Sequence, residues 1–137
     1  MSQSRKNIRD AVVTLLSGAT AAGTNVYANR ETSLWETELP AILVYTKEET
    51  AEPRSISYKQ SIRTLDLIVE IKALATEIVD NQLEDIAEDV ETVMIANQSL
   101  SGSALSVEYI STSISLDSDS ETEKGVAALT FKVKYIK

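Results

Sequence analysis

Carboxylates are the side chains in this sequence whose type and spacing could support chemistry. The 137 residues include 21 Asp and Glu but no histidine and no cysteine. This excludes Ser-His-Asp and Cys-His nucleophilic sites and thiolate metal sites, and it leaves almost no way to build a zinc site. The four glycines form no loop that would hold a phosphate group. Two acidic segments, 77–91 and 117–121, therefore remain as candidate sites.

The first segment carries carboxylates one helical turn apart. Glu84–Glu88 and Asp85–Asp89 are like-charged pairs at i and i+4, and no Lys or Arg lies among them. Each such pair destabilises a helix by roughly a few tenths of a kcal/mol. Paired carboxylates can serve acid-base catalysis, but these lie on the polar side of an amphipathic pattern, without the burial that catalysis needs. Two interpretations stay open: a solvated face, or a face that meets a basic partner or repels nucleic acid.

The second segment has alternating carboxylates at Asp117, Asp119 and Glu121, a spacing that suggests a calcium loop. An EF-hand loop requires Gly at its sixth position and Glu at its twelfth. Counted from Asp117, these positions hold Thr122 and Ala128. The motif fails, so a solvated hairpin tip with at most weak divalent binding is the better interpretation. We expect no cofactor and no resident metal.

The balance of charge excludes further classes of function. The net charge is −8, whereas binding to phosphate groups needs clustered Lys and Arg, so nucleic-acid binding is not expected. No apolar window is long enough to span a membrane, and the polar start MSQSRKNIRD has no signal-peptide core. The length suits one domain, 1–137. We expect the protein to stay in the compartment where it is made.

The single tryptophan, Trp35, lies in an acidic stretch with Glu31, Glu36 and Glu38 and not in the apolar run 41–44 that follows. Two explanations stay open. The ring could cover the edge of a sheet in its own subunit, since a large exposed apolar side chain is a liability. It could instead be an anchor in a pocket of a neighbouring subunit, with the acids as a polar rim, because Trp is enriched at such hot spots.

Two segments have helical periodicity, and they must position the first acidic segment. Residues 4–17 have one apolar stripe, with Ser4 as a possible cap and Gly18 as a stop. Residues 76–97 have another, with the capping candidate Thr76. The first helix also places basic residues in its first turn, where the helix dipole disfavours them. They are either a solvated end or a contact with an acidic neighbour: Arg5, Lys6 and Arg9.

The remaining segments are predicted to be strands separated by polar turns. Residues 41–46 are apolar without alternation, as in a strand covered on both faces. Residues 58–73 alternate, with Leu65, Leu67, Val69 and Ile71 on one side, which predicts a half-buried antiparallel strand. The other predicted strands are 26–29, 105–117 with a bulge near Tyr109, and 126–136.

The order is helix, three strands, helix, two strands. It predicts an α+β fold: a mainly antiparallel sheet of four to five strands with two helices packed on one face. Two polar loops, 47–57 and 117–125, are the best placed to reach a neighbour. With the tryptophan segment they supply the candidate interface residues: Trp35, Glu36, Glu38, Glu48, Glu49, Arg54, Asp117, Asp119, Glu121 and Glu123.

Several of these segments resemble the lambda-type tail terminator and minor tail proteins of long-tailed phages. The resemblance rests on YANR…ELPAILVYT, on the alternating strand TLDLIVEI, on the acidic helix, and on the acidic-tipped hairpin before VAALTFKVKYI. It covers nearly the whole chain and includes no catalytic signature. It implies a virion protein with no reaction, which forms a hexameric ring on the completed tail tube and offers a docking surface to the head.

The resemblance also implies partners and a place. The partners are further copies of the chain, the tail tube protein and the head-tail connector proteins, at the neck-proximal end of the tail and, during assembly, in the host cytoplasm. DNA would pass through the ring without specific binding, since a negative lumen repels phosphate. Glu84, Glu88 and Glu91 are then candidates for the lumen or for a partner face.

Two alternatives stay open. Within the virion class, the chain could be a head-tail completion or connector protein, or a tube subunit. In another class, it could be an acidic cytoplasmic binding module whose helix mimics nucleic acid. A ring former should assemble as concentration rises, whereas a mimic should stay small and bind a basic protein.

Overall fold

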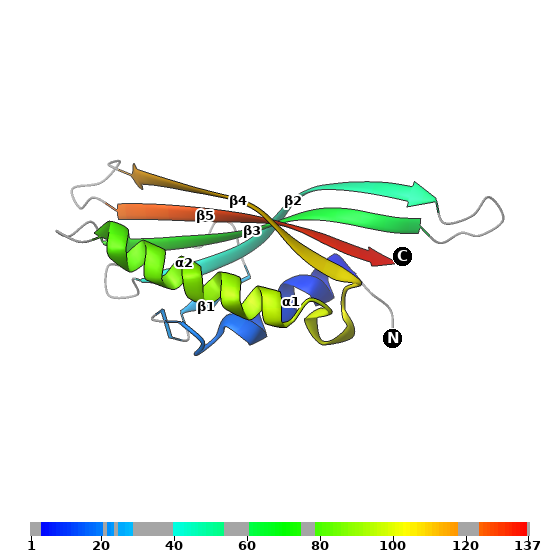
Figure 1. Cartoon of the computed structure of the whole chain (residues 1–137), viewed down its shortest axis with the longest axis horizontal. Coiled ribbons are helices and arrows are strands. Elements are labelled where there is room, and N and C mark those ends of the chain that lie inside the picture. The colour runs from blue at the N-terminus through cyan, green and yellow to red at the C-terminus, as the bar shows by residue number, and fades with distance from the viewer. Residues whose placement is uncertain are drawn as a thin grey trace.

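Five strands form one sheet, and two helices pack against one of its faces (Figure 1). The computed structural model describes residues 4–20, 22–23, 25–28, 40–53, 61–74, 79–117 and 124–136. The strand order is β1-β2-β3-β5-β4. β1 pairs with β2 in parallel and the other pairs are antiparallel. The predicted α+β class, strand number and helix placement are confirmed. The bounds are α1 Arg5–Leu16, β1 Val26–Tyr27, β2 Ala41–Pro53, β3 Ser61–Leu74, α2 Val79–Ala96, the 3₁₀ helix η2 Leu100–Gly102, β4 Ser106–Asp117 and β5 Lys124–Ile136.

Helix α1 begins and ends close to the predicted residues. The side chain of Ser4 accepts a hydrogen bond from the backbone N–H of Asn7 at 3.1 Å, which satisfies one of the unpaired donors of the first turn. The helix stops at Leu16, and Gly18 follows with φ +78°, a conformation that glycine adopts without strain. The residues that it buries are those of the predicted stripe: Ile8, Val12 and Leu16.

The core lies between the sheet and the two helices. The alternation of β3 is confirmed, since Leu65, Leu67, Val69 and Ile71 are all buried on the side of the helices. β5, the neighbour of β3 in the sheet, contributes a second row of buried side chains on the same face, and the apolar stripe of α2 covers both strands. The main contributors from these two elements are Ala127, Leu129, Phe131, Val133, Tyr135, Leu83, Ile86, Val90 and Met94.

β2 is longer than the sequence predicted. Its first residues, 41–44, are buried on both faces of the sheet, as expected. The strand then continues through the polar stretch KEETAEP to Pro53, where we expected a loop or hairpin tip. Backbone pairing with β3 continues as far as Pro53 opposite Ser61, so tertiary pairing overrides the polar composition. The register shifts between Thr46 and Glu49, which marks an irregularity in the strand.

The predicted bulge in β4 is confirmed. The register shifts between Tyr109 and Ser111, and Ile110 is the extra residue. Tyr109 lies opposite Phe131 on the side of the helices, and the two rings meet edge to face with centroids 5.7 Å apart. Beyond the bulge the phase changes, so that Ile114, and not Ser113, shares the face of the core residue Ala127.

The substitution Phe131→Ala tests the phase of β5. Phe131 is 0% exposed in the centre of the core, so its truncation should lower the free energy of unfolding by about 3–5 kcal/mol. Urea unfolding measures this change. The matched control is Ser113→Ala on the exposed face of β4, which should stay within about 0.5 kcal/mol of the parent. A loss below about 1 kcal/mol for Phe131→Ala would contradict this description of the core.

Candidate functional site

Most of the interface candidates from the sequence lie outside the described residues. These are Trp35, Glu36, Glu38, Arg54, Asp119, Glu121 and Glu123, and they stay predictions. Asp117 is the last residue of β4, where its backbone pairs with Lys124 of β5. Glu48 is exposed on β2, whereas Glu49 is half-buried and bound within the chain. The described residues present three surfaces, of which the sequence singled out the acidic helix as a candidate site.

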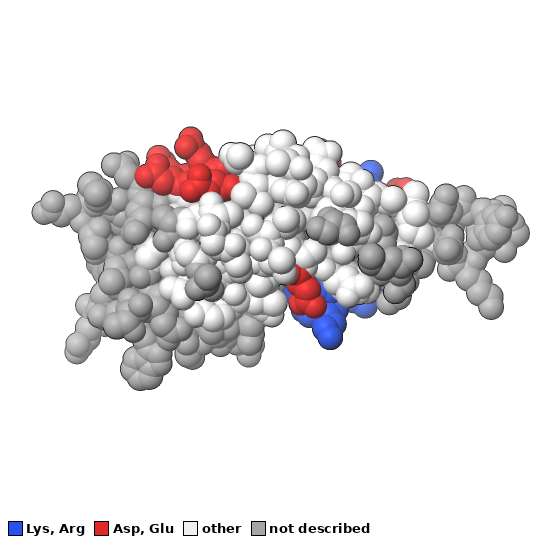
Figure 2. Space-filling model, turned by 90° about the horizontal axis from the view of Figure 1, so that it is seen from below, with Lys and Arg blue, Asp and Glu red and all other residues white. Residues whose placement is uncertain are grey.

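The first surface is the acidic face of α2, formed by Glu84, Asp85, Glu88 and Asp89. All four side chains are exposed, and Glu91 beside them is half-buried. They lie outward because Leu83, Ile86, Ala87 and Val90 hold the opposite side of the helix against the sheet. Figure 2 shows acidic side chains gathered at one end of the helix layer, with no basic side chain among them. None of the four forms an ion pair within the described residues.

The second surface is the apolar edge at β4, which adjoins the acidic face. Five large apolar side chains are exposed in the described part of the chain, and all five belong to β4, to Leu105 just before it, or to the end of α2, which packs against β4. Among the described strands, β4 is terminal and pairs only with β5, so none of them covers its outer side. The exposed fractions run from 40% to 60%, for Ile95, Leu105, Tyr109, Ile110 and Ile114.

The third surface is a basic recess at the start of α1. A hollow of about 370 Å³ is lined by Ser4, Arg5, Lys6, Arg9 and Thr46. Three cations thus border one hollow on a chain of net charge −8. Lys6 and Arg9 form no ion pair within the described residues. The Nε of Arg9 is enclosed by protein atoms and has no hydrogen-bond acceptor there. A buried donor without an acceptor lowers the stability of the fold.

A polar cluster around Glu49 joins β2, β3, β5 and α1 next to this recess. One carboxylate oxygen of Glu49 accepts a hydrogen bond from Arg63 at 3.0 Å, and the other accepts one from the hydroxyl of Tyr135. Arg5 lies 3.8 Å from the same carboxylate. Burial raises the pKa of Tyr135 above its usual 10.0, and the neighbouring Glu49 raises it further through its hydrogen bond and its charge. These contacts hold the Glu49 side chain within its own chain. We therefore interpret Glu49 as a residue that holds together the elements next to the recess.

The three surfaces differ in charge and polarity. No group of three or more His, Cys, Asp or Glu side chains that could hold a metal ion occurs among the described residues. Within the same part of the chain, no helix is long and apolar enough to cross a membrane. What remains is a pair of charged surfaces with opposite signs and one apolar edge.

Sequence reasoning missed the apolar edge and underrated the recess. Ile110 offered a signal, because the bulge that was expected near Tyr109 must put one residue out of phase with the core. Arg5, Lys6 and Arg9 offered another, because three cations in a first helical turn oppose the helix dipole. Neither signal shows which edge of the sheet each surface occupies, because that depends on the strand order.

The pKa of Tyr135 predicts a loss of stability at alkaline pH. The folded protein favours the neutral phenol of Tyr135. Its contribution to the free energy of unfolding is therefore present below about pH 10 and is lost as the pH rises through the raised pKa. Tyr135→Phe should cost about 1–2 kcal/mol near neutral pH, since Glu49 loses a donor, and should remove this alkaline loss. Urea unfolding between about pH 8 and pH 11 measures both effects. Tyr109→Phe removes a hydroxyl whose hydrogen bond with Thr112 is exposed, so this control should keep the alkaline loss.

The acidic face of α2 should be dispensable for folding. Replacing Glu84, Glu88 and Glu91 with Gln removes like-charge repulsion along the helix. The triple variant should therefore be as stable as the parent, or more stable by up to about 0.5 kcal/mol, in urea unfolding at low salt. A variant that unfolds or loses several kcal/mol would show that these carboxylates are paired inside the fold.

Comparisons with known proteins agree with the fold and identify the family. Among solved structures, the chain is similar to a chain described as "Virion of native gene transfer agent (GTA) particle", with a TM-score of 0.50, 12% sequence identity and 94% of each chain covered. At this identity the likeness shows the fold alone. A search of curated proteins finds no match. The family model described as "Phage minor tail protein U" matches residues 3–135, so the chain belongs to this family and is a structural, non-enzymatic protein of the phage tail.

Proposed function

We propose that this protein forms a ring that caps the completed tail tube and then offers a docking surface to the head. The observation that carries the proposal is the family match, which spans residues 3–135 and so includes nearly all of the described helices and strands. The family is one of minor tail proteins, and a subunit present in few copies suits the end of a tube better than its repeating wall. The specific partners are the tail tube protein and the head-tail connector proteins.

The charge of the chain supports a ring through which DNA passes. Six copies at −8 each carry −48. A lumen lined by part of this charge repels phosphate, so DNA slides through without adhering. Glu84, Glu88 and Glu91 are candidates for that lumen or for a partner face, and the exposure of Glu84 and Glu88 leaves both roles open to them. The ring would lie at the neck-proximal end of the tail, after assembly in the host cytoplasm.

Trp35 keeps its two explanations under this proposal. As an anchor, it would fill a pocket on the neighbouring subunit or on the tube, with Glu36 and Glu38 as part of the rim. As a cover, it would lie against its own sheet. Its segment lies outside the described residues, so both explanations stay predictions from the sequence.

A nucleic-acid mimic is the second candidate function, and the acidic face of α2 is the observation in its favour. The basic recess speaks against it, because a surface that imitates nucleic acid needs negative charge alone. A connector or tube subunit is the alternative within the virion class, and the same experiment separates it from a terminal ring.

The test is complementation of tails that assemble without this protein. In a lysate that lacks it, tube polymerisation should run past the normal length, and heads should not join, because the end of the tube is not capped. The purified protein should restore both properties, and negative-stain microscopy measures tube length and joining. Tubes of normal length that carry heads without the protein would overturn the proposal. Tubes that fail to form at all would make it a tube subunit.

A further inference from the structure

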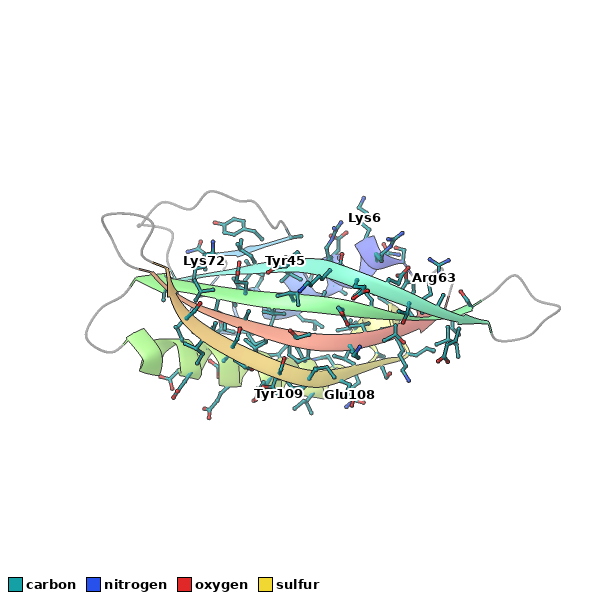
Figure 3. All side chains as sticks on the ribbon, turned by 90° about the horizontal axis from the view of Figure 1, so that it is seen from above. Lys6, Tyr45, Arg63, Lys72, Glu108 and Tyr109 are labelled. Carbon is teal, nitrogen blue, oxygen red and sulfur yellow. The ribbon has the colours of Figure 1, made fainter. Side chains whose placement is uncertain are left out.

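The acidic and basic surfaces lie on opposite edges of the molecule. α1 packs under β2, whereas α2 packs under β3, β5 and β4. In Figure 3, Lys6 lies beyond β2 on one side of the sheet, and Tyr109 and Glu108 lie at β4 on the other. Figure 2, from the side of the helices, shows a red patch over α2 and, well apart from it, a blue patch with a smaller red patch beside it. The edge formed by α2 and β4 is acidic, and we call it the acidic edge. The opposite edge, α1 with β2, is mixed in charge, because Asp10, Glu48, Glu49 and Glu52 accompany its cations. Only its recess, lined by Arg5, Lys6 and Arg9, is called the basic edge.

Each edge carries charges that the fold leaves uncompensated. The acidic edge holds Glu84, Asp85, Glu88 and Asp89, which repel one another along the helix and have no ion pair within the described residues. The basic edge holds Lys6 and Arg9, likewise without an ion pair within the described residues. A contact between the two edges would place the carboxylates of α2 next to Lys6 and Arg9, so that each group of like charges gains partners of the opposite sign.

The apolar edge supplies apolar area that an interface can bury, which charged side chains alone do not provide. Stable interfaces have an apolar centre and a polar rim. The exposed side chains of Ile95, Leu105, Tyr109, Ile110 and Ile114 belong to β4, to the residue before it and to the end of α2, so a contact over the acidic edge would also bury apolar area. β4 is also a 12-residue terminal strand, and a long edge strand with exposed apolar side chains is a surface that proteins normally cover.

We propose that the acidic edge of one copy docks on the basic edge of the next, with carboxylates of the α2 face meeting Lys6 and Arg9 at the recess. The occupant of each edge is a second copy of this chain, because the same chain carries both complementary surfaces on opposite sides. Two different surfaces joined head to tail form a closed ring when the rotation between copies closes. This inference rests on the proposed ring function, and it names the surfaces that build the ring.

The test compares charge reversals at the two edges with reversals of the same size elsewhere. Glu88→Lys changes the acidic edge, and its control is Glu70→Lys on the face of the sheet opposite the helices. Lys6→Glu changes the basic edge, and its control is Lys134→Glu on that same opposite face. Sedimentation velocity at low salt gives the dissociation constant of self-association. Each edge variant should weaken it on the order of tenfold, as expected for a close charge pair across an interface, while the controls stay near the parent.

Mixing the two edge variants tests which surfaces meet. Neither Glu88→Lys nor Lys6→Glu should associate well alone. An equimolar mixture should associate, because the lysine introduced into the acidic edge of one variant then faces the glutamate introduced into the basic edge of the other. Ile95→Ala, which removes apolar area from the same edge without a change of charge, should also weaken association. Urea unfolding of every variant excludes loss of folding as the cause.

Three results would overturn the inference. The first is that edge variants and controls associate equally well. The second is that the mixture of edge variants does not recover association. The third is that the parent chain stays monomeric alone while Glu88→Lys and Lys6→Glu cap tails as well as their controls do. All of these leave the proposed function standing, because that function is judged by the parent protein on tails. Failure of the parent to cap tails, with edge-dependent self-association intact, would overturn the proposed function alone.

Discussion

The contact between α2 and the central strands β3 and β5 is the interaction on which the rest of the surface depends. Leu83, Ile86 and Val90 lie against the sheet, and this fixes the rotation of the helix about its axis. Once that rotation is fixed, the carboxylates at 84, 85, 88 and 89 can lie only on the solvent side. A different phase of the stripe would carry these acids toward the core, where unpaired charges are prohibitively costly. Packing in the core thus decides where the charge is displayed.

Elements with strong periodicity could be predicted from the sequence, and the reason is local. β3 places a core residue at every second position from Leu65 to Ala73, and α1 begins next to a capping residue, Ser4, that accepts a hydrogen bond from the first turn. The bulge in β4 was also predictable, since an apolar residue out of phase signals an extra residue. In each case the side chains of one segment carry the pattern, so no knowledge of the neighbouring strands is needed.

The second half of β2 and the two edges could not be predicted, and the reason is tertiary. KEETAEP has the composition of a loop, yet it is strand because β3 offers it a ladder of hydrogen bonds. The edges depend on the order β1-β2-β3-β5-β4, in which the last two strands of the chain are exchanged. That exchange makes β4 terminal, and so Ile110 and Ile114 are exposed although their segment looks as apolar as a core strand.

The separation of charge between the edges also bears on which assemblies can form. In a two-fold arrangement each surface meets its own copy, so acidic faces of α2 would meet each other and basic recesses would meet each other. Both contacts place like charges together, which costs stability and slows encounter. The head-to-tail contact alone brings opposite signs together, and it leaves one edge free at each end until the ring closes. Under the proposed docking, the carboxylates of the α2 face therefore select the one arrangement that can close into a ring.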